Sequence, residues 1–114
     1  MIYTKTSALL QSIETELRNL QLWSETAPTP AALVSTAPFC FDSMPFAQWL
    51  QFVFLPRMWA LVDGRLPLPS QISICPMAEH VFQAQGSAAW ILINRIADLD
   101  ELLSGKREQT VARH

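Results

Sequence analysis

The chain opens and closes with stretches in which apolar residues recur at helical spacing. The first stretch runs from about Thr4 or Thr6 to Trp23. Its apolar positions step by four, four and three residues, which places them on one face of an α-helix; they are Leu9, Ile13, Leu17 and Leu20. The last stretch, which Ser87 begins as an N-cap, has an apolar stripe of Leu92, Ile96, Leu99 and Leu103. We therefore predict an amphipathic helix at each end of the chain.

The middle of the chain holds its most apolar stretch. From Phe46 to Val62, thirteen of the seventeen residues are apolar. Such a helix is either central in a bundle or crosses a membrane. Seventeen residues are barely enough for a crossing, and Arg57 and Pro56 oppose one. We predict a buried central helix, kinked near Phe52–Leu55 because Pro56 removes a backbone hydrogen bond.

Capping residues set the bounds of the two inner helices. Ser43 is an N-cap for the central helix, with Pro45 in the first turn. A short third helix is predicted from Pro76 to Gln85. All three glycines follow a predicted helix end, where a left-handed C-cap residue belongs; they are Gly64, Gly86 and Gly105.

Two connectors are broken by prolines, which lack an N–H and restrict the preceding residue. The first, residues 24–45, contains Pro28, Pro30, Pro38 and Pro45, and the second, residues 64–76, contains Pro67, Pro69 and Pro76. The first connector also contains apolar residues, namely Leu33, Val34, Phe39, Cys40 and Phe41. We expect these residues to pack across the bundle, because a long structureless loop is uncommon in a compact domain.

Together the elements predict an all-α fold, a small bundle of about four helices with a proline-kinked central helix and long packed connectors. A chain of 114 residues has no room for a second core. We assign residues 1–105 to a single helical-bundle domain and residues 106–114 to a flexible C-terminal tail.

Composition narrows the classes of partner. Hydrophobic residues make up 50% of the chain and charged residues 16%, against roughly 25% charged in an average domain. We therefore expect some apolar surface to meet a protein partner or a second copy of the chain. The formal net charge is -2 and the basic residues are scattered, which argues against direct nucleic-acid binding.

The cysteines and the first ten residues bear on compartment and cofactors. Met1–Leu10 contains one lysine and no long apolar run, so we expect no secretory signal and a cytoplasmic protein. Cys40 and Cys75 are then reduced core residues. Two thiols cannot supply a four-ligand metal site, and no motif indicates a cofactor.

Arg57 is the most informative candidate residue. With 100° per residue it falls on an apolar side of the central helix, together with Phe46, Leu50, Val53 and Leu61. A buried arginine needs a partner, and we expect either Glu79 on the third helix or carbonyls freed by the Pro56 kink. The alternative is that Arg57 binds an anion or a protein partner.

The other candidates are aromatic or acidic. Trp49 and Trp59 point about 80° apart on a straight helix, so one of them could face outward as an interface anchor. His80, beside Glu79, is interpreted as a partly exposed helix residue. The acidic cluster is interpreted as the solvated side of the last helix; it comprises Asp98, Asp100 and Glu101.

Residues in and around the central helix form a specific pattern. It consists of Pro38-Phe39, Asp42, Met44, Trp49-Leu50-Gln51, Val53, Pro56-Arg57-Met58, Leu61, Asp63, Pro67-Leu68-Pro69, Pro76 and Glu79. This pattern resembles the small bacterial YqcC-like family, over about Pro38 to Phe82. The chain departs from the family at Pro45, Cys75 and Met77, which affects local packing. Asp42, Pro56, Gly64 and the prolines of the second connector are interpreted as structural.

The resemblance implies a helical bundle in a cytoplasmic bacterial protein with no settled activity. Genes of the family often lie beside one for a tRNA pseudouridine synthase, which suggests an accessory role in tRNA modification. We therefore expect a non-enzymatic protein-interaction module, with such a synthase as the candidate partner. The alternative is a small enzyme or anion-binding protein built around Arg57, Glu79 and His80. A cleft that joins these three residues would favour the alternative.

Overall fold

Helices make up the regular structure of residues 2–107, which are the residues that the computed structural model describes. Their order is α1 (Ile2–Asn19), α2 (Pro30–Leu33), η1 (Pro38–Cys40), α3 (Phe46–Trp49), η2 (Leu50–Phe54), α4 (Leu55–Asp63), α5 (Cys75–Val81), η3 (Phe82–Ala89) and α6 (Trp90–Ser104). No strand occurs among these residues, and the predicted all-α class is confirmed. Residues 108–114 of the predicted tail lie outside the described residues.

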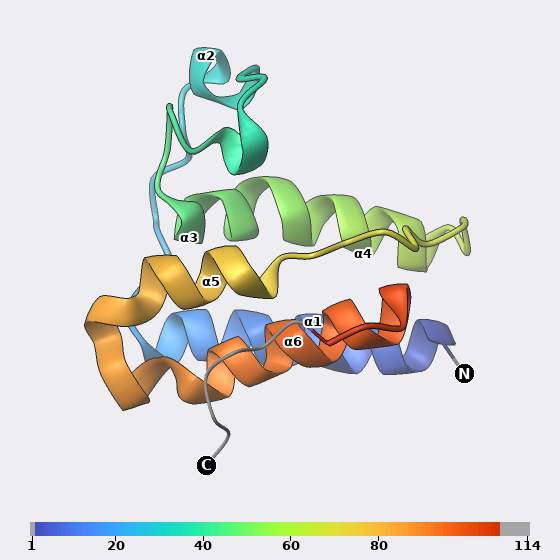
Figure 1. Ribbon diagram of the computed structural model, residues 1–114. Coiled ribbons are helices and arrows are strands. Elements are labelled where there is room, and N and C mark those ends of the chain that lie inside the picture. The colour runs from blue at the N-terminus through green and yellow to red at the C-terminus, as the bar shows by residue number, and fades with distance from the viewer. Residues whose placement is uncertain (1, 108–114) are drawn as a thin grey trace.

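The longer helices lie roughly along one direction (Figure 1). α1 and α6 run antiparallel and share the most extensive helix contact. The consecutive segments α3, η2 and α4 form one rod that packs on α1, and α5 packs on α6. A projecting arm that contains α2 and η1 stands away from the bundle at one end of the rod.

The first helix confirms a buried stripe but shifts its members. Leu10 is fully buried, whereas Leu9 and Leu20 are only partly buried. The helix ends at Asn19 and does not reach Trp23 as predicted. The reason is Gln21, whose φ of 60° is left-handed and terminates a helix. The Leu22 N–H then bonds the Leu17 carbonyl at 2.8 Å.

The middle rod shows how the chain accommodates Pro56. One row of its buried positions recurs at every fourth residue, namely Phe46, Leu50, Phe54, Met58 and Val62, and Ala47, Gln51 and Leu55 form a shorter buried row beside it. Steps of four drift around an α-helix by about 40° each. The π-helical turn η2, directly before α4, takes up part of this drift because a π turn holds more residues than an α turn. At the place of the predicted kink the structure has a change of helix type, from the π turn η2 to α4.

Several predicted caps differ from the structure. Pro45 is the N-cap of α3, and the hydroxyl of Ser43 instead donates to the Ala32 carbonyl at 2.7 Å. After α4, Gly64 has a φ of -85°, and Arg65 takes the left-handed position with a φ of 53°. Gly105, with a φ of 78°, is the predicted left-handed C-cap of α6.

The turn between α5 and α6 is more irregular than predicted. Gly86 lies within η3 with φ 58° and ψ -139°, a conformation outside the left-handed helical region. Because the 3-10 segment comes first, α6 starts only at Trp90. Its N-cap residue is Ala89, which forms no side-chain capping hydrogen bond. Ser87 therefore does not cap the last helix.

The first connector packs less than its composition suggested. Cys40 is buried and Phe39 packs on the core. Val34, however, is 76% exposed and Phe41 63% exposed, so the expectation that the whole connector lies across the bundle is wrong. Short local hydrogen bonds hold the arm together instead, such as Ser35 to Asp42 at 2.5 Å. Because the arm folds on itself, its outer apolar residues remain in solvent.

The acidic residues of α6 are not one solvated cluster. The side chain of Asp100 is buried and accepts the N–H groups of Ile74 and Cys75, both at 2.8 Å. Asp100 therefore caps the start of α5, where a carboxylate is favoured by unpaired N–H groups and the helix dipole. The prediction of a solvated role is wrong for this residue.

Asp98 and Glu101 are closer to the prediction, because they lie at the surface and form ion pairs. Arg107 bonds Asp98 at 2.6 Å and Glu101 at 3.2 Å. Burial opposes the charge of Arg107, but these two carboxylates outweigh burial, so the pKa of Arg107 is raised. The first residues of the predicted tail are thus attached to α6.

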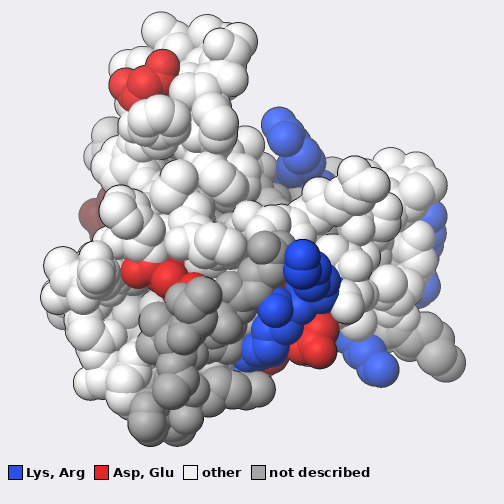
Figure 2. All heavy atoms as spheres, viewed as in Figure 1, with Lys and Arg blue, Asp and Glu red and all other residues white. Residues whose placement is uncertain are grey.

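Two further expectations can be compared directly with the structure. Cys40 and Cys75 are both buried and are not joined in a disulfide, as predicted. No helix within residues 2–107 is long and apolar enough to cross a membrane. Figure 2 shows that most of the face it presents is uncharged, with one acidic group on the projecting arm.

Candidate functional site

A largely apolar groove lies beside the middle rod. We call it the Arg57 groove, and it encloses about 540 Å³. Its walls come from Phe39 of η1, from the rod, and from residues 67–69 and 71–74 of the second connector. The rod contributes Trp49, Phe54, Arg57, Met58 and Leu61. The rod contributes buried residues to the core, as the predicted central helix should, but it is less enclosed than predicted because one flank faces this groove.

An aromatic cluster fixes one end of the Arg57 groove. Trp49 stacks on Phe54 with ring centres 5.4 Å apart, and Phe39 meets Trp49 edge-on at 4.9 Å. Edge-on and offset arrangements are favourable for aromatic rings. Phe39 reaches this position from a left-handed backbone conformation with a φ of 57°, which is uncommon for a bulky residue. The ring of Trp49 is thus held in place while it stays partly accessible.

Arg57 is exposed at the margin of this groove. It forms no hydrogen bond or ion pair with any residue that the structure describes. The expected burial and pairing with Glu79 are therefore wrong. The predicted position of Arg57 holds for a helix with 100° per residue throughout, whereas the π turn η2 changes the helical phase just before Arg57. Among the residues that line the groove, Arg57 alone carries a charge.

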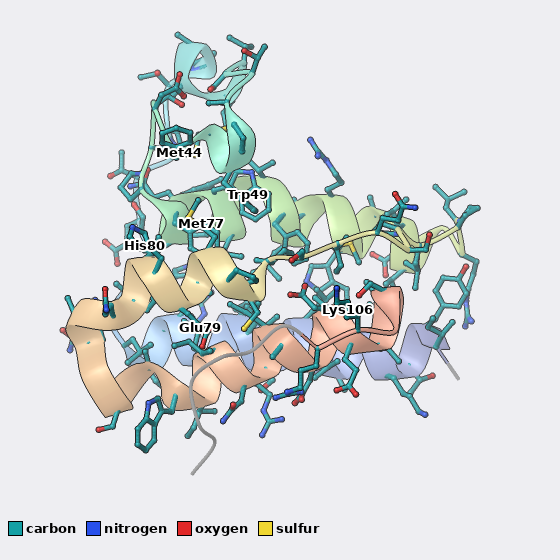
Figure 3. The ribbon with its side chains drawn as sticks, viewed as in Figure 1. Met44, Trp49, Met77, Glu79, His80 and Lys106 are labelled. Atoms are coloured by element: carbon teal, nitrogen blue, oxygen red, sulfur yellow. The ribbon has the colours of Figure 1, made fainter. Side chains whose placement is uncertain are left out.

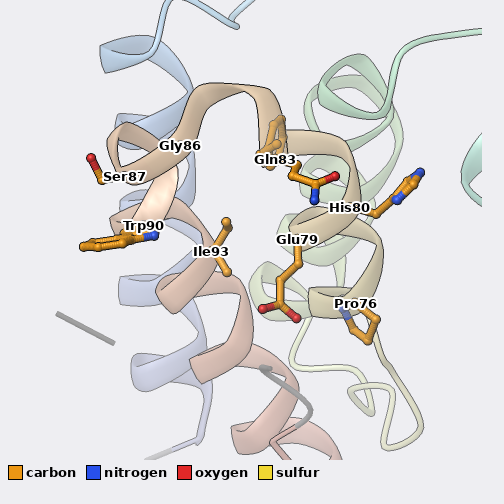
Figure 4. Close-up of a pocket in the computed structure, with 9 residues that line it drawn as sticks. Pro76, Glu79, His80, Gln83, Gly86, Ser87, Trp90 and Ile93 are labelled. Carbon is orange, nitrogen blue, oxygen red and sulfur yellow. The ribbon is translucent and has the colours of Figure 1, made fainter. Parts of the chain in front are cut away.

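Glu79 and His80 line a different groove, which we call the Glu79 groove. It encloses about 520 Å³ between α5 and α6, and Pro76 and Trp90 also line it. Glu79 points between the two helices, whereas His80 points away from Trp90 (Figure 4). Trp49 and Glu79 lie on opposite sides of α5 (Figure 3). The two grooves share no lining residue, so the structure does not join Arg57, Glu79 and His80 in one cleft.

The remaining predicted residues divide between the two grooves and the scaffold. Pro67 and Pro69 line the Arg57 groove. Pro76 occupies the first turn of α5, where the missing N–H is tolerated. Trp59 is partly buried against the core and lines neither groove. Of the two tryptophans on the rod, Trp49 is therefore the one that meets the criterion for an interface anchor.

Two polar residues with clear structural roles escaped prediction. Asp100 occupies an apolar stripe of α6 with Ile93, Ile96 and Leu103, a signal that the sequence did contain. Gln51 is buried, and its side-chain amide exchanges two hydrogen bonds of 2.7 Å with the backbone of Ser24. Nothing in the sequence indicates this long-range pairing. No group of three metal-binding side chains occurs within residues 2–107.

Comparison with known proteins identifies the family. The model of the DUF446 family, whose description reads "tRNA pseudouridine synthase C", matches residues 5–102. The chain belongs to this family. An uncharacterized protein YqcC from Escherichia coli K12 is 34% identical over 95 residues, covering 83% of this chain and 87% of the relative. An uncharacterized protein from Haemophilus influenzae is 34% identical over 98 residues, covering 86% of this chain and 92% of the relative.

Two further comparisons concern fold and chain organisation. The solution structure of Escherichia coli YqcC has a TM-score of 0.78 at 29% identity, covering 99% of this chain and 94% of that chain. This agreement confirms both the predicted family and the helical fold. A tRNA pseudouridine synthase C from Pectobacterium carotovorum is 46% identical over 66 residues, which are 58% of this chain and 18% of that protein. Most of that synthase therefore lies outside the similar segment.

Proposed function

We propose that this chain is a non-enzymatic protein-interaction module whose partner is a tRNA pseudouridine synthase. The observation that carries the proposal is the Pectobacterium protein named as such a synthase, of which a segment similar to this chain forms 18%. In that protein the two parts belong to one polypeptide, and a covalent link raises the effective concentration of one part near the other. Separate chains would need a complementary surface to achieve the same association.

The Arg57 groove is the surface that supports this function best. An apolar groove with an aromatic anchor and an arginine at its edge has the composition of a protein-binding hot spot. Several residues on which the family resemblance depends also line this groove, including Phe39, Trp49, Arg57 and the Pro67–Pro69 run. The exposed apolar residues of the projecting arm add surface of the same kind near Phe39.

The rival function, a small enzyme or an anion-binding protein, has less support. It requires Arg57, Glu79 and His80 to act together, and these residues line two separate grooves. Proton transfer needs the reacting groups within hydrogen-bond reach. A lone exposed arginine beside apolar walls suits a protein segment better than a small anion, which several donors usually hold.

The test is binding to the tRNA pseudouridine synthase C of the same host. Calorimetric titration of the two purified full-length proteins should give a saturable one-to-one complex. Deletion of the gene for this chain should lower pseudouridine in host tRNA, and the wild-type gene should restore it. Analytical ultracentrifugation of the chain alone controls for self-association. Absence of a complex together with unchanged pseudouridine would refute the proposal.

A further inference from the structure

The second connector, which lines the Arg57 groove with Leu68, Gln71 and Ile72 among others, contains backbone groups without hydrogen-bond partners among the described residues. One end is held by Tyr3, whose hydroxyl donates to the Leu66 carbonyl at 2.8 Å. The other end is held by Asp100, which accepts the Ile74 N–H. Between these points, Leu68, Ser70, Gln71 and Ile72 form no backbone hydrogen bond with any described residue. The connector is therefore anchored at both ends, and these four residues between the anchors have backbone groups without a hydrogen-bond partner in the described chain.

Such a segment is suited to pairing with another extended chain. Unpaired N–H and C=O groups in a row are a template for added backbone hydrogen bonds. Leu68 and Ile72 pack against the core, which holds the connector in position before any partner arrives. Prior ordering of a binding segment reduces the entropy cost of association.

The charge of the groove restricts the partner further. Arg57 is its only charged lining residue, and no carboxylate lines the groove. An arginine guanidinium matches a carboxylate with two parallel hydrogen bonds. Apolar walls around the pair strengthen the attraction relative to open water. The groove is therefore complementary to an apolar segment that carries one acidic side chain.

The spacing along the rod gives the register of such a segment. Trp49 and Arg57 are eight residues apart, which corresponds to about 12 Å along a helix. An extended chain advances about 3.3 Å per residue. A partner residue that packs on Trp49 and an acidic residue that meets Arg57 are thus separated by about three or four positions.

From these features we infer that the Arg57 groove binds an extended segment of the synthase, in which an apolar anchor and an Asp or Glu lie three or four residues apart. The inference rests on the proposed function and names the partner chemistry of the same site. The anchor packs on Trp49, the carboxylate pairs with Arg57, and the backbone bonds the free edge of the second connector.

The decisive experiment is a charge exchange. Overlapping peptides that cover the host synthase are immobilised and probed with the full chain, and the binding peptides should contain the stated spacing. Arg57→Glu should weaken binding to the intact synthase by about 30-fold or more, the loss expected for a desolvated charge pair. Replacing the acidic residue by Lys in the peptide should restore binding to the Arg57→Glu chain. Lys5→Glu makes the same charge change on α1, outside the groove, and should leave binding unchanged.

Hydrogen exchange provides the second readout. In the complex with the intact synthase, amide exchange at Leu68, Ser70, Gln71 and Ile72 should slow. If the chain does not bind the synthase at all, the proposed function and this inference fail together. If the chain binds the synthase but neither Arg57→Glu nor hydrogen exchange reveals an effect, the inference is overturned and the proposed function stands.

Discussion

The two sides of the bundle use their charged residues in opposite ways. On the α1–α6 side, Arg18 pairs with Glu14 at 3.2 Å, Arg107 pairs with Asp98, and Asp100 is buried as a cap. On the side of the middle rod, Arg57 stands unpaired beside an apolar groove. The first side therefore uses charged groups to hold its own helices together, whereas the second side is where we propose that the partner binds. Mutations on the first side should therefore affect folding, and mutations on the second should affect binding.

The largest effect should follow the loss of the Asp100 carboxylate. Asp100→Ala leaves the Ile74 and Cys75 N–H groups unsatisfied in the interior, which should lower the free energy of unfolding by about 3 kcal/mol. For a chain of this size, the melting temperature should fall by more than about 10 °C. Asp100→Asn keeps an acceptor oxygen and should cost less. If the alanine variant and the wild type have the same melting temperature, the Asp100 carboxylate does not stabilise the start of α5.

The second prediction compares the two tryptophans of the rod. Both side chains are partly buried against the core, but only Trp49 lines the Arg57 groove. Trp49→Ala should therefore weaken binding of the synthase by about 2 kcal/mol or more, as for an interface hot spot. Trp59→Ala should lower stability without a comparable change in the dissociation constant. Titrations below the melting temperatures of both variants separate the effect on affinity from the effect on stability. If both variants lose the same affinity for the synthase, Trp49 is not the anchor of the interface.

The two sides of the bundle also differ in how well the sequence predicts them. The α1 and α6 helices were foreseen because their stripes step by three and four residues and fit a regular α-helix. The middle rod was foreseen as a helix, but its stripe recurs at every fourth residue and needs a π turn. Arg57 was misplaced for that reason. An apolar helix is expected to be buried, but its sequence does not indicate whether its own chain or another chain covers it.

The caps show a second limit. Gly105 adopts the left-handed conformation that its position predicts, whereas Arg65 takes this role in place of Gly64. A capping preference amounts to about 1 kcal/mol, so the path of the following connector can override it. Gln51 and Ser24 are 27 positions apart, and no local rule connects them. The candidate site was therefore foreseen in part, through Trp49 and Arg57, while its groove required the tertiary structure.

The third prediction concerns the attachment of the first connector to the rod. Gln51 forms two hydrogen bonds with the Ser24 backbone, and Gln51→Ala should lower the free energy of unfolding by about 1–2 kcal/mol. Gln51→Glu keeps the acceptor for the Ser24 N–H but sets a buried carboxylate oxygen against the Ser24 carbonyl, so its cost should be at least as large. Urea unfolding at constant pH measures both. An alanine variant as stable as the wild type would show that the connector is held by other contacts.

The smallest effect on stability should come from Arg57 itself. Its side chain is exposed and forms no ion pair with described residues, so Arg57→Ala should change the free energy of unfolding by no more than about 0.5 kcal/mol. Because Arg57 and Glu79 line separate grooves, the double variant Arg57→Ala/Glu79→Ala should show additive effects within about 0.5 kcal/mol. Binding of the synthase should nevertheless fall. A stability loss above about 1 kcal/mol, or strong coupling to Glu79, would mean that Arg57 completes the fold, and the contrast between the two sides would then disappear.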